Sequence, residues 1–121
     1  QNRMWILGGG TYDTPKVPSR NFYNDVWSSA DGVEWTRHLE AARWSPRQYH
    51  DVAVFDNRMW VLEGYSKTGG NRNDVWYSSD GINWRELPNT PWKPRHAAVS
   101  MASLLPRTDV FTQSGSSISI L

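Results

Sequence analysis

The chain has 121 residues with a formal net charge of +1, and 38% of its residues are apolar. This length suits one domain, and the balanced, interspersed charges give no reason to expect a nucleic acid or a membrane surface as partner. The absence of cysteine excludes disulfides, thiolate nucleophiles and cysteine-based metal sites.

Short β-strands are predicted along the chain, because runs rich in Val, Ile and Trp alternate with turn residues and no helical periodicity is present. In chain order they lie near 3–8, 24–29, 33–37, 51–56, 58–63, 73–78, 82–86 and 96–101. The apolar runs 4–7, 52–55 and 59–62 predict strands covered on both faces. The strands near 33–36 and 82–85 alternate, so one face of each is expected to be wet.

Two Asp-Gly pairs predict the hairpin turns. Asp31-Gly32 and Asp80-Gly81 are typical of type I′ turns, in which both central residues need positive φ. We expect each Asp side chain to accept hydrogen bonds from backbone N–H groups across its turn.

The second half of the chain repeats the first. NDVWSSADGVEW at 24–35 and NDVWYSSDGINW at 73–84 are identical at eight of twelve positions. The eight tryptophans fall into four matching pairs: Trp5 with Trp60, Trp27 with Trp76, Trp35 with Trp84, and Trp44 with Trp92. A repeat of about 50 residues is typical of solenoids, propellers and arrays. A flat β-sandwich would explain the hairpins but not the repeat.

These observations predict an all-β fold, a β-propeller fragment of about two four-stranded antiparallel blades. Residues 1–121 form a single partial propeller, with 2–49 as the first unit, 50–100 as the second, and 101–121 as a degenerate tail or the start of a third blade. Two blades leave apolar faces bare, so we expect further blades from a longer chain or association of copies. Three chains giving six blades is the simplest closed ring.

The repeated features resemble the kelch repeat of β-propellers over about residues 2–101. They are MWILGG closing one strand, NDVW opening the next, a Trp ending the hairpin, and PR leading into RQYHDVAVF. One departure is Glu63, which stands where the first unit has Gly8 of its double glycine. The resemblance implies that HDVAVF is the innermost strand, beside a central channel, and that the strands carrying Trp35 and Trp84 are outermost.

The hairpins 29–35 and 78–84 also resemble the Asp-box of sialidase-type propellers, although there one residue normally separates Asp from Gly. This resemblance implies a structural role at the blade periphery. The expected structural repeat residues are therefore Trp5, Trp27, Trp35, Trp60, Trp76, Trp84, Asp31, Gly32, Asp80 and Gly81.

The loop at 10–23 is six residues longer than its counterpart at 65–72, and length variation on a constant scaffold marks where binding differs. The kelch resemblance implies that this loop and the PR loop rise on one face, around the channel mouth. The candidate ligand-binding residues are Arg47, Arg95, Tyr12, Arg20, Tyr65 and Arg72. The alternative for Arg47 and Arg95 is a packing role on Trp44 or Trp92, with a salt bridge between blades.

No catalytic or metal-ligating pattern stands out. His38, His50 and His96 lack metal-ligand spacing, and no cofactor is expected. Galactose oxidase, a copper enzyme of the kelch superfamily, uses a Cys-linked Tyr that this chain cannot form. Glu63 would have a raised pKa if buried, although we expect it to reach solvent at the end of its strand.

Two functions follow as hypotheses. The first is a kelch-type module that binds a protein or glycan without catalysis of its own. The alternative is part of a carbohydrate-active propeller enzyme, such as a sialic acid isomerase or sialidase, in which an Arg cluster holds a sugar carboxylate. A carboxylate or Tyr facing the Arg side chains at the channel mouth would distinguish them. No targeting segment is visible, and the compartment stays open.

Overall fold

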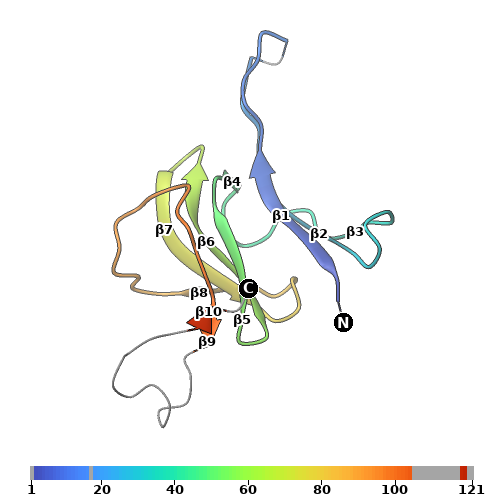
Figure 1. Ribbon diagram of the computed structural model, residues 1–121. Helices are drawn as coiled ribbons and strands as arrows, with labels where there is room; N and C mark the ends of the chain where they lie inside the picture. Colours follow the sequence, from blue (N-terminus) through green and yellow to red (C-terminus); the bar gives the residue numbers. More distant parts are fainter. Residues whose placement is uncertain (1, 17, 105–117, 120–121) are drawn as a thin grey trace.

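A computed structural model of the chain describes residues 2–16, 18–104 and 118–119 (Figure 1). These residues form an open, antiparallel, all-β structure without a helix, which confirms the predicted fold class. Accordingly, the described residues include no helix with the length and apolarity to cross a membrane.

Each sequence unit folds as an antiparallel meander. The first contains β1 (Met4–Gly10), β2 (Phe22–Ser29) and β3 (Thr36–Leu39). The second contains β5 (Asp51–Phe55), β6 (Arg58–Ser66), β7 (Gly70–Ser78) and β8 (Arg85–Leu87). The strand predicted near 51–56 pairs within the second unit, where β6 is its only neighbour among the described strands.

A short strand that the sequence did not predict, β4 (Arg47–Gln48), joins the two meanders. Arg47 pairs with Tyr23 of β2 on one side and with Ser66 of β6 on the other. The loops 10–22 and 66–70 lie at this same end of the sheet, which we call the upper rim (Figure 1).

The strand predicted near 96–101 is not formed. At its start only an isolated bridge joins Arg95 to Arg72, the counterpart of the bridge between Arg47 and Tyr23. β4 becomes a strand because β6 offers it a second partner, and no following meander does the same for Arg95 among the described residues. β9 (Ser103–Leu104) pairs instead with β10 (Ile118–Ser119), and most of the predicted tail 101–121 lies outside the described residues.

The Asp-Gly hairpins are longer than type I′ turns, so that part of the prediction is wrong. Only their glycines have positive φ, 82° at Gly32 and 80° at Gly81. The type I′ turn lies between β5 and β6, where Asp56 and Asn57 have φ of 54° and 55°.

The Asp side chains close the longer hairpins as expected. Asp31 Oδ1 accepts hydrogen bonds from the N–H groups of Val33 and Glu34 at 2.8 and 2.9 Å. Asp80 Oδ1 does the same for the two residues at matching positions, both at 2.8 Å. These backbone N–H groups lower the pKa of both carboxyls, because they bind the charged form.

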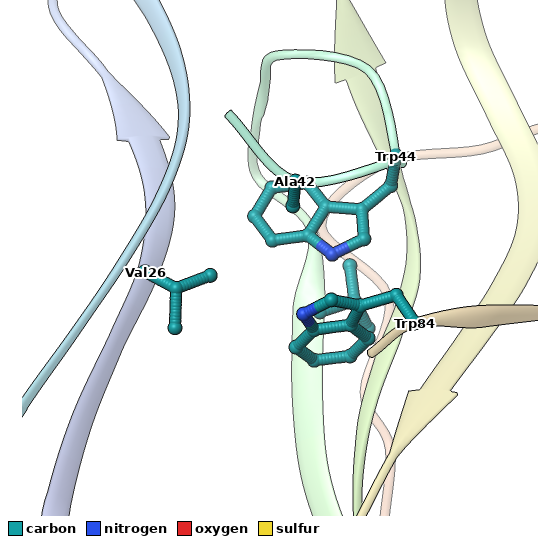
Figure 2. Packing of buried hydrophobic residues seen from close by; sticks show 5 residues of the cluster. Val26, Ala42, Trp44 and Trp84 are labelled. Atoms are coloured by element: carbon teal, nitrogen blue, oxygen red, sulfur yellow. The ribbon is translucent and has the colours of Figure 1, made fainter. Parts of the chain in front are cut away.

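The core lies between the two meanders (Figure 2). The Trp44 and Trp84 rings meet edge to face, 5.8 Å between centroids and at 86°, an arrangement that aromatic rings favour. Val26 of β2 and Val61 of β6 approach this pair from opposite sides of the interface, and Ala42 completes the buried set. The contact is between units, not within one.

Two strands expected to be covered on both faces are not. In β5, Val52 and Val54 are exposed, because this strand is an edge and no described layer lies over that face. In β1, Met4 and Ile6 face solvent while Trp5 and Leu7 pack on the core. The run 59–62 is covered as predicted, with its side chains buried or partly buried.

Candidate binding site

The repeated asparagine of NDVW holds the loop that precedes each Pro-Arg pair. Asn24 Nδ2 donates to the carbonyl oxygens of Ala42 and Trp44, at 3.1 and 3.0 Å. In the second unit Asn73 Nδ2 donates in the same way to the Trp92 carbonyl, at 3.1 Å. The motif thereby fixes where each Trp-x-Pro-Arg segment begins.

The repeated aspartate accepts a hydrogen bond from the tryptophan two residues later. The indole Nε1 of Trp27 donates to Asp25 at 2.8 Å, and that of Trp76 donates to Asp74 at 2.9 Å. One carboxylate therefore has the same position in both units, and in the second unit it faces Arg47.

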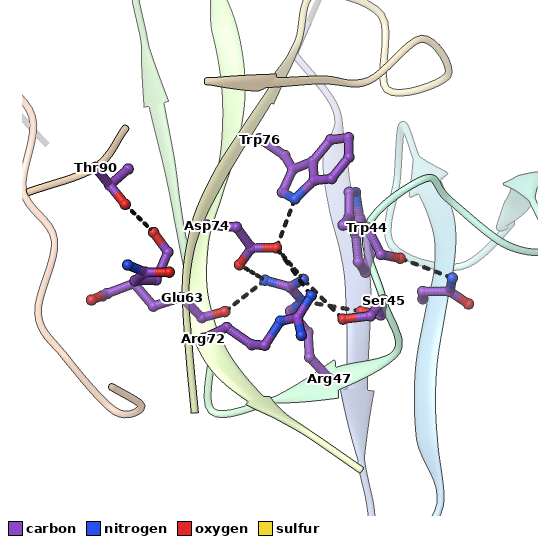
Figure 3. Close-up of polar contacts among 10 residues, drawn as sticks. Trp44, Ser45, Arg47, Glu63, Arg72, Asp74, Trp76 and Thr90 are labelled. Carbon is purple, nitrogen blue, oxygen red and sulfur yellow. Dashed lines mark hydrogen bonds and ion pairs between the residues drawn. The ribbon is translucent and has the colours of Figure 1, made fainter. Parts of the chain in front are cut away.

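Arg47 is fully buried, and the chain itself uses all five of its N–H donors (Figure 3). Nε and Nη2 bond the backbone and hydroxyl oxygens of Ser45, and Nη1 bonds the Glu63 carbonyl at 2.8 Å. The remaining two donors form a bidentate pair with the Asp74 carboxylate at 2.7 and 2.8 Å. Arg47 thus has the packing role, a salt bridge between units, and offers no donor to a ligand.

Asp74 stays ionised in this setting. Burial alone would raise its pKa, but the hydrogen bonds and charge of Arg47 outweigh burial and hold the pKa below its ordinary value. Arg72 adds a longer contact, with Nη2 3.9 Å from Asp74 Oδ2. The guanidinium of Arg72 is thus directed at the ion pair below the upper rim.

Arg95 occupies the matching position in the second unit but is largely exposed. Its Nε donates to the Lys93 carbonyl at 3.0 Å, just as Arg47 Nε donates to Ser45. Its nearest carboxylate in the described chain is that of Glu63, with Oε2 3.8 Å from Nε. No described residue forms the bidentate pair that Asp74 forms with Arg47.

Glu63 is buried, contrary to the expectation that it would reach solvent. It has φ of 58°, close to the 61° of Gly8 at the same β-bulge of the first unit, so a non-glycine residue holds a left-handed conformation. Burial raises the pKa of its carboxyl, and Asp51 adds to the rise while Arg95 opposes it. A carboxylate therefore does face one of the candidate arginines.

Arg20 lies in an aromatic enclosure at the upper rim. Its Cζ is 5.5 to 5.7 Å from the ring centroids of Tyr12, Phe22 and Tyr65, within cation–π range. Its Nε is buried without a hydrogen-bond partner. The long loop of the first unit and the β6–β7 hairpin of the second thus meet around one guanidinium.

Two more rings extend this enclosure. The ring centroid of Tyr49 lies 6.1 Å from that of Tyr12 and 5.6 Å from that of His96. The His96 centroid in turn lies 6.0 Å from that of Tyr65. A hydrogen bond to Tyr49 raises the pKa of the Tyr12 hydroxyl. We call the set the rim cluster: Tyr12, Arg20, Phe22, Tyr49, Tyr65 and His96.

Two hollows flank Arg20. One, of about 280 Å³, is lined by Asp13, Ser19, Arg20, Phe22, Tyr65 and Lys67. The other, of about 330 Å³, is lined by Arg20, Asn21, Phe22, Pro46, Lys67 and Thr68. Both combine ring surface with cationic side chains.

The six candidate ligand residues therefore separate into groups. Tyr12, Arg20 and Tyr65 come together in the rim cluster, whereas Arg47 is buried below it. The sequence missed Phe22, Tyr49 and His96 as cluster members. A signal existed for Tyr49, because the matching position of the second unit is Ala97 and both residues have left-handed φ, 57° and 55°. A large side chain in only one of the two units indicates that this position has a different role in the two units.

Each of the three histidines has one hydrogen bond within the chain, while Nδ1 of His50 is buried without a partner among the described residues. Their hydrogen bonds, each 2.6 Å long, join His38 to Ser28, His50 to the Leu7 carbonyl, and His96 to Asn71. Within the ranges that the structure describes, no three His, Asp or Glu side chains are grouped as a metal ion would need.

Comparison with known proteins gives a partial relationship. No family model matches the chain. Over 66 aligned residues it is 37% identical to the Leucine-zipper-like transcriptional regulator 1 homolog of Drosophila melanogaster. The match covers 51% of this chain and 7% of that protein, so it concerns a small part of the relative.

Proposed function

We propose that the chain is a kelch-type binding module that recognises a protein or glycan through the rim cluster and has no catalysis of its own. The observation that carries this proposal is Arg20, enclosed by three aromatic rings at 5.5 to 5.7 Å. The enclosure uses the loop in which the two units differ most, at the rim where both units present their hairpins.

The chemistry of the rim cluster suits recognition. Tyrosine faces supply rigid apolar surface with a polar edge, and Tyr and Arg are enriched among the residues that dominate interface energies. Arg20 is held over rings, so little side-chain entropy is lost when a carboxylate or carbonyl binds it. These properties fit a sugar ring or an extended peptide.

The kelch assignment draws on several observations together. The motifs that resemble the kelch repeat sit at matching structural positions in both units, and the Pro-Arg arginine of the first ties the units to each other.

The test is a screen of glycan and peptide arrays, followed by affinity measurements on the hits. Arg20→Ala and Tyr65→Ala should each weaken binding about 30-fold or more, the effect of losing a hot-spot residue. Arg58→Ala is the matched control, since Arg58 stacks on Tyr77 at 5.2 Å at the far end of β6. Binding that ignores both rim substitutions, or falls equally in the control, would contradict the proposal.

A second candidate function rests on Glu63. Its buried carboxyl faces Arg95 at 3.8 Å, a carboxylate–arginine pair of the kind a sialic acid isomerase or sialidase-like enzyme would need. Incubation with sialic acid and sialosides, followed by NMR, tests this alternative. Turnover that Glu63→Gln abolishes would establish it, and no turnover would leave the binding proposal.

A further inference from the structure

The two units are unequally covered. In the second unit Met59, Val61, Trp76 and Trp84 pack against the first unit. We call the matching set in the first unit the leading face: Met4, Ile6, Trp27 and Trp35. Ile6 is 50% exposed against 0% for Val61, and Trp35 is 37% exposed against 1% for Trp84. The leading face carries the same kinds of residue that form the interface between the units, but no part of the described chain covers it.

The opposite surface shows the reverse. The first unit receives the second with Trp5, Leu7, Val26, Leu39 and Trp44. The matching side chains of the second unit, Trp60, Leu62, Val75, Leu87 and Trp92, line an apolar groove of about 400 Å³. We call it the trailing groove. One wall is formed by the segment 100–103.

The charged groups repeat this asymmetry. Between the units, Arg47 of the first pairs with Asp74 of the second. Their counterparts are Arg95 beside the trailing groove and Asp25 beside the leading face. Asp25 already carries the Trp27 indole bond that Asp74 has from Trp76, and Arg95 already has the Nε bond of Arg47. Arg95 and Asp25 are therefore held as Arg47 and Asp74 are, and each is the type of group that the other would pair with.

We propose that a second copy of this chain docks head to tail, with its leading face in the trailing groove and its Asp25 bonded to Arg95. The contact repeats the interface between the two units, so its packing and its bidentate ion pair are those already seen inside the chain. Because two different surfaces meet, the association is heterologous, and it closes into a ring or grows as a filament.

Light scattering after size exclusion tests the association first. The mass of the wild-type chain should rise above 13.9 kDa with concentration. Ile6→Arg blocks the leading face and Leu87→Arg blocks the trailing groove, and both positions are exposed enough to accept the change. Each variant alone should be monomeric. A one-to-one mixture should give a dimer and nothing larger, because one open surface remains on each chain.

Val54→Arg is the matched control, since Val54 is 75% exposed on β5 but points away from the groove, and it should associate like the wild type. A wild-type chain that stays monomeric at all concentrations would overturn the proposal. So would a mixture that stays monomeric or grows beyond the dimer.

The ion pair has its own test. Asp25→Arg alone and Arg95→Asp alone should abolish association, because each brings like charges together across the contact. The double variant restores opposite charges and should associate again. Thermal melting of the monomers checks that all three variants fold. A double variant no better than the single ones would remove the Asp25–Arg95 pair from the proposal.

Discussion

Trp35 and Trp84 occupy the same position in their units, yet only one is in the core. Both indoles donate to the carbonyl of the hairpin glycine three residues earlier, at 3.2 and 3.0 Å. Trp84 also packs on Trp44, whereas no described unit covers Trp35. Local sequence therefore sets the hydrogen bond of the indole, and the neighbouring unit sets its burial.

We predict unequal costs for truncating this pair. Trp84→Ala should lower the free energy of unfolding by about 3–5 kcal/mol, because a fully buried indole leaves a cavity. Trp35→Ala should cost less than half as much, since part of its ring stays in water. Urea denaturation of both variants measures the difference, and equal losses would show that both indoles are equally covered.

Arg47 and Arg95 form a second natural comparison. Arg47→Ala should cost about 3–5 kcal/mol, because it leaves the buried Asp74 carboxylate without its partner. Arg95→Ala should change stability by no more than about 0.5 kcal/mol in the monomer, as exposed positions do. Denaturation at low protein concentration checks both values. A small effect of Arg47→Ala would contradict its assignment as the tie between units.

Glu63 should make stability depend on pH. Its folded pKa is raised above the ordinary value of 4.5, so the native state holds a proton that the unfolded chain releases earlier. The contribution of Glu63 to stability therefore falls as pH rises through and above its ordinary pKa of 4.5. Glu63→Gln should lose this dependence and gain stability relative to wild type at the higher pH. A difference between the two proteins that is constant with pH would show that the carboxyl is not perturbed.

At the scale of elements, the sequence predicted most strands of the meanders, because apolar runs, turn residues and the repeat gave independent support. It could not predict β4, whose two residues become a strand only by lying between β2 and β6. It misplaced the type I′ turn, because Asp-Gly also suits a longer hairpin that an Asp side chain closes. The first error arises where contacts distant in sequence decide the backbone, and the second arises because two local turn geometries suit the same Asp-Gly pair.

The candidate site could be predicted only in part, because contacts distant in sequence decide which of its residues are exposed. The greater length of the loop at 10–23 can be read from the sequence, so Tyr12 and Arg20 could be chosen from that loop. The depth of Arg47 could not be predicted, because it depends on Asp74 in the other unit. The kelch and propeller assignments, and the ligand itself, stay predictions.

The long hairpin can be separated from the fold. Replacing residues 11–21 by the three-residue turn 67–69 of the second unit should change stability by no more than about 1 kcal/mol, since loop-closure cost varies slowly with length. The same change removes Tyr12 and Arg20, so it should abolish binding of any array hit. Retained binding in a folded variant would move the site away from the rim cluster.

At the scale of the whole molecule, the chain is two copies of one meander whose principal core lies between the copies. This arrangement leaves one apolar surface at each end of the described stack, and the two surfaces are complementary because they are repeats of the surfaces already in contact. Each of the four tryptophan pairs has one member in each unit, so the solvent exposure of the two members can be compared.

The most direct measurement is ¹⁹F NMR of the chain with fluorinated tryptophan, comparing chemical shifts in H₂O and D₂O at a concentration where the chain is monomeric. Single Trp→Phe variants assign the eight signals. The structure predicts no solvent isotope shift for Trp44 and Trp84, which are buried between the units, and a clear shift for Trp35. Equal solvent shifts for Trp35 and Trp84, or solvent contact at Trp44, would contradict a core formed between two repeated units.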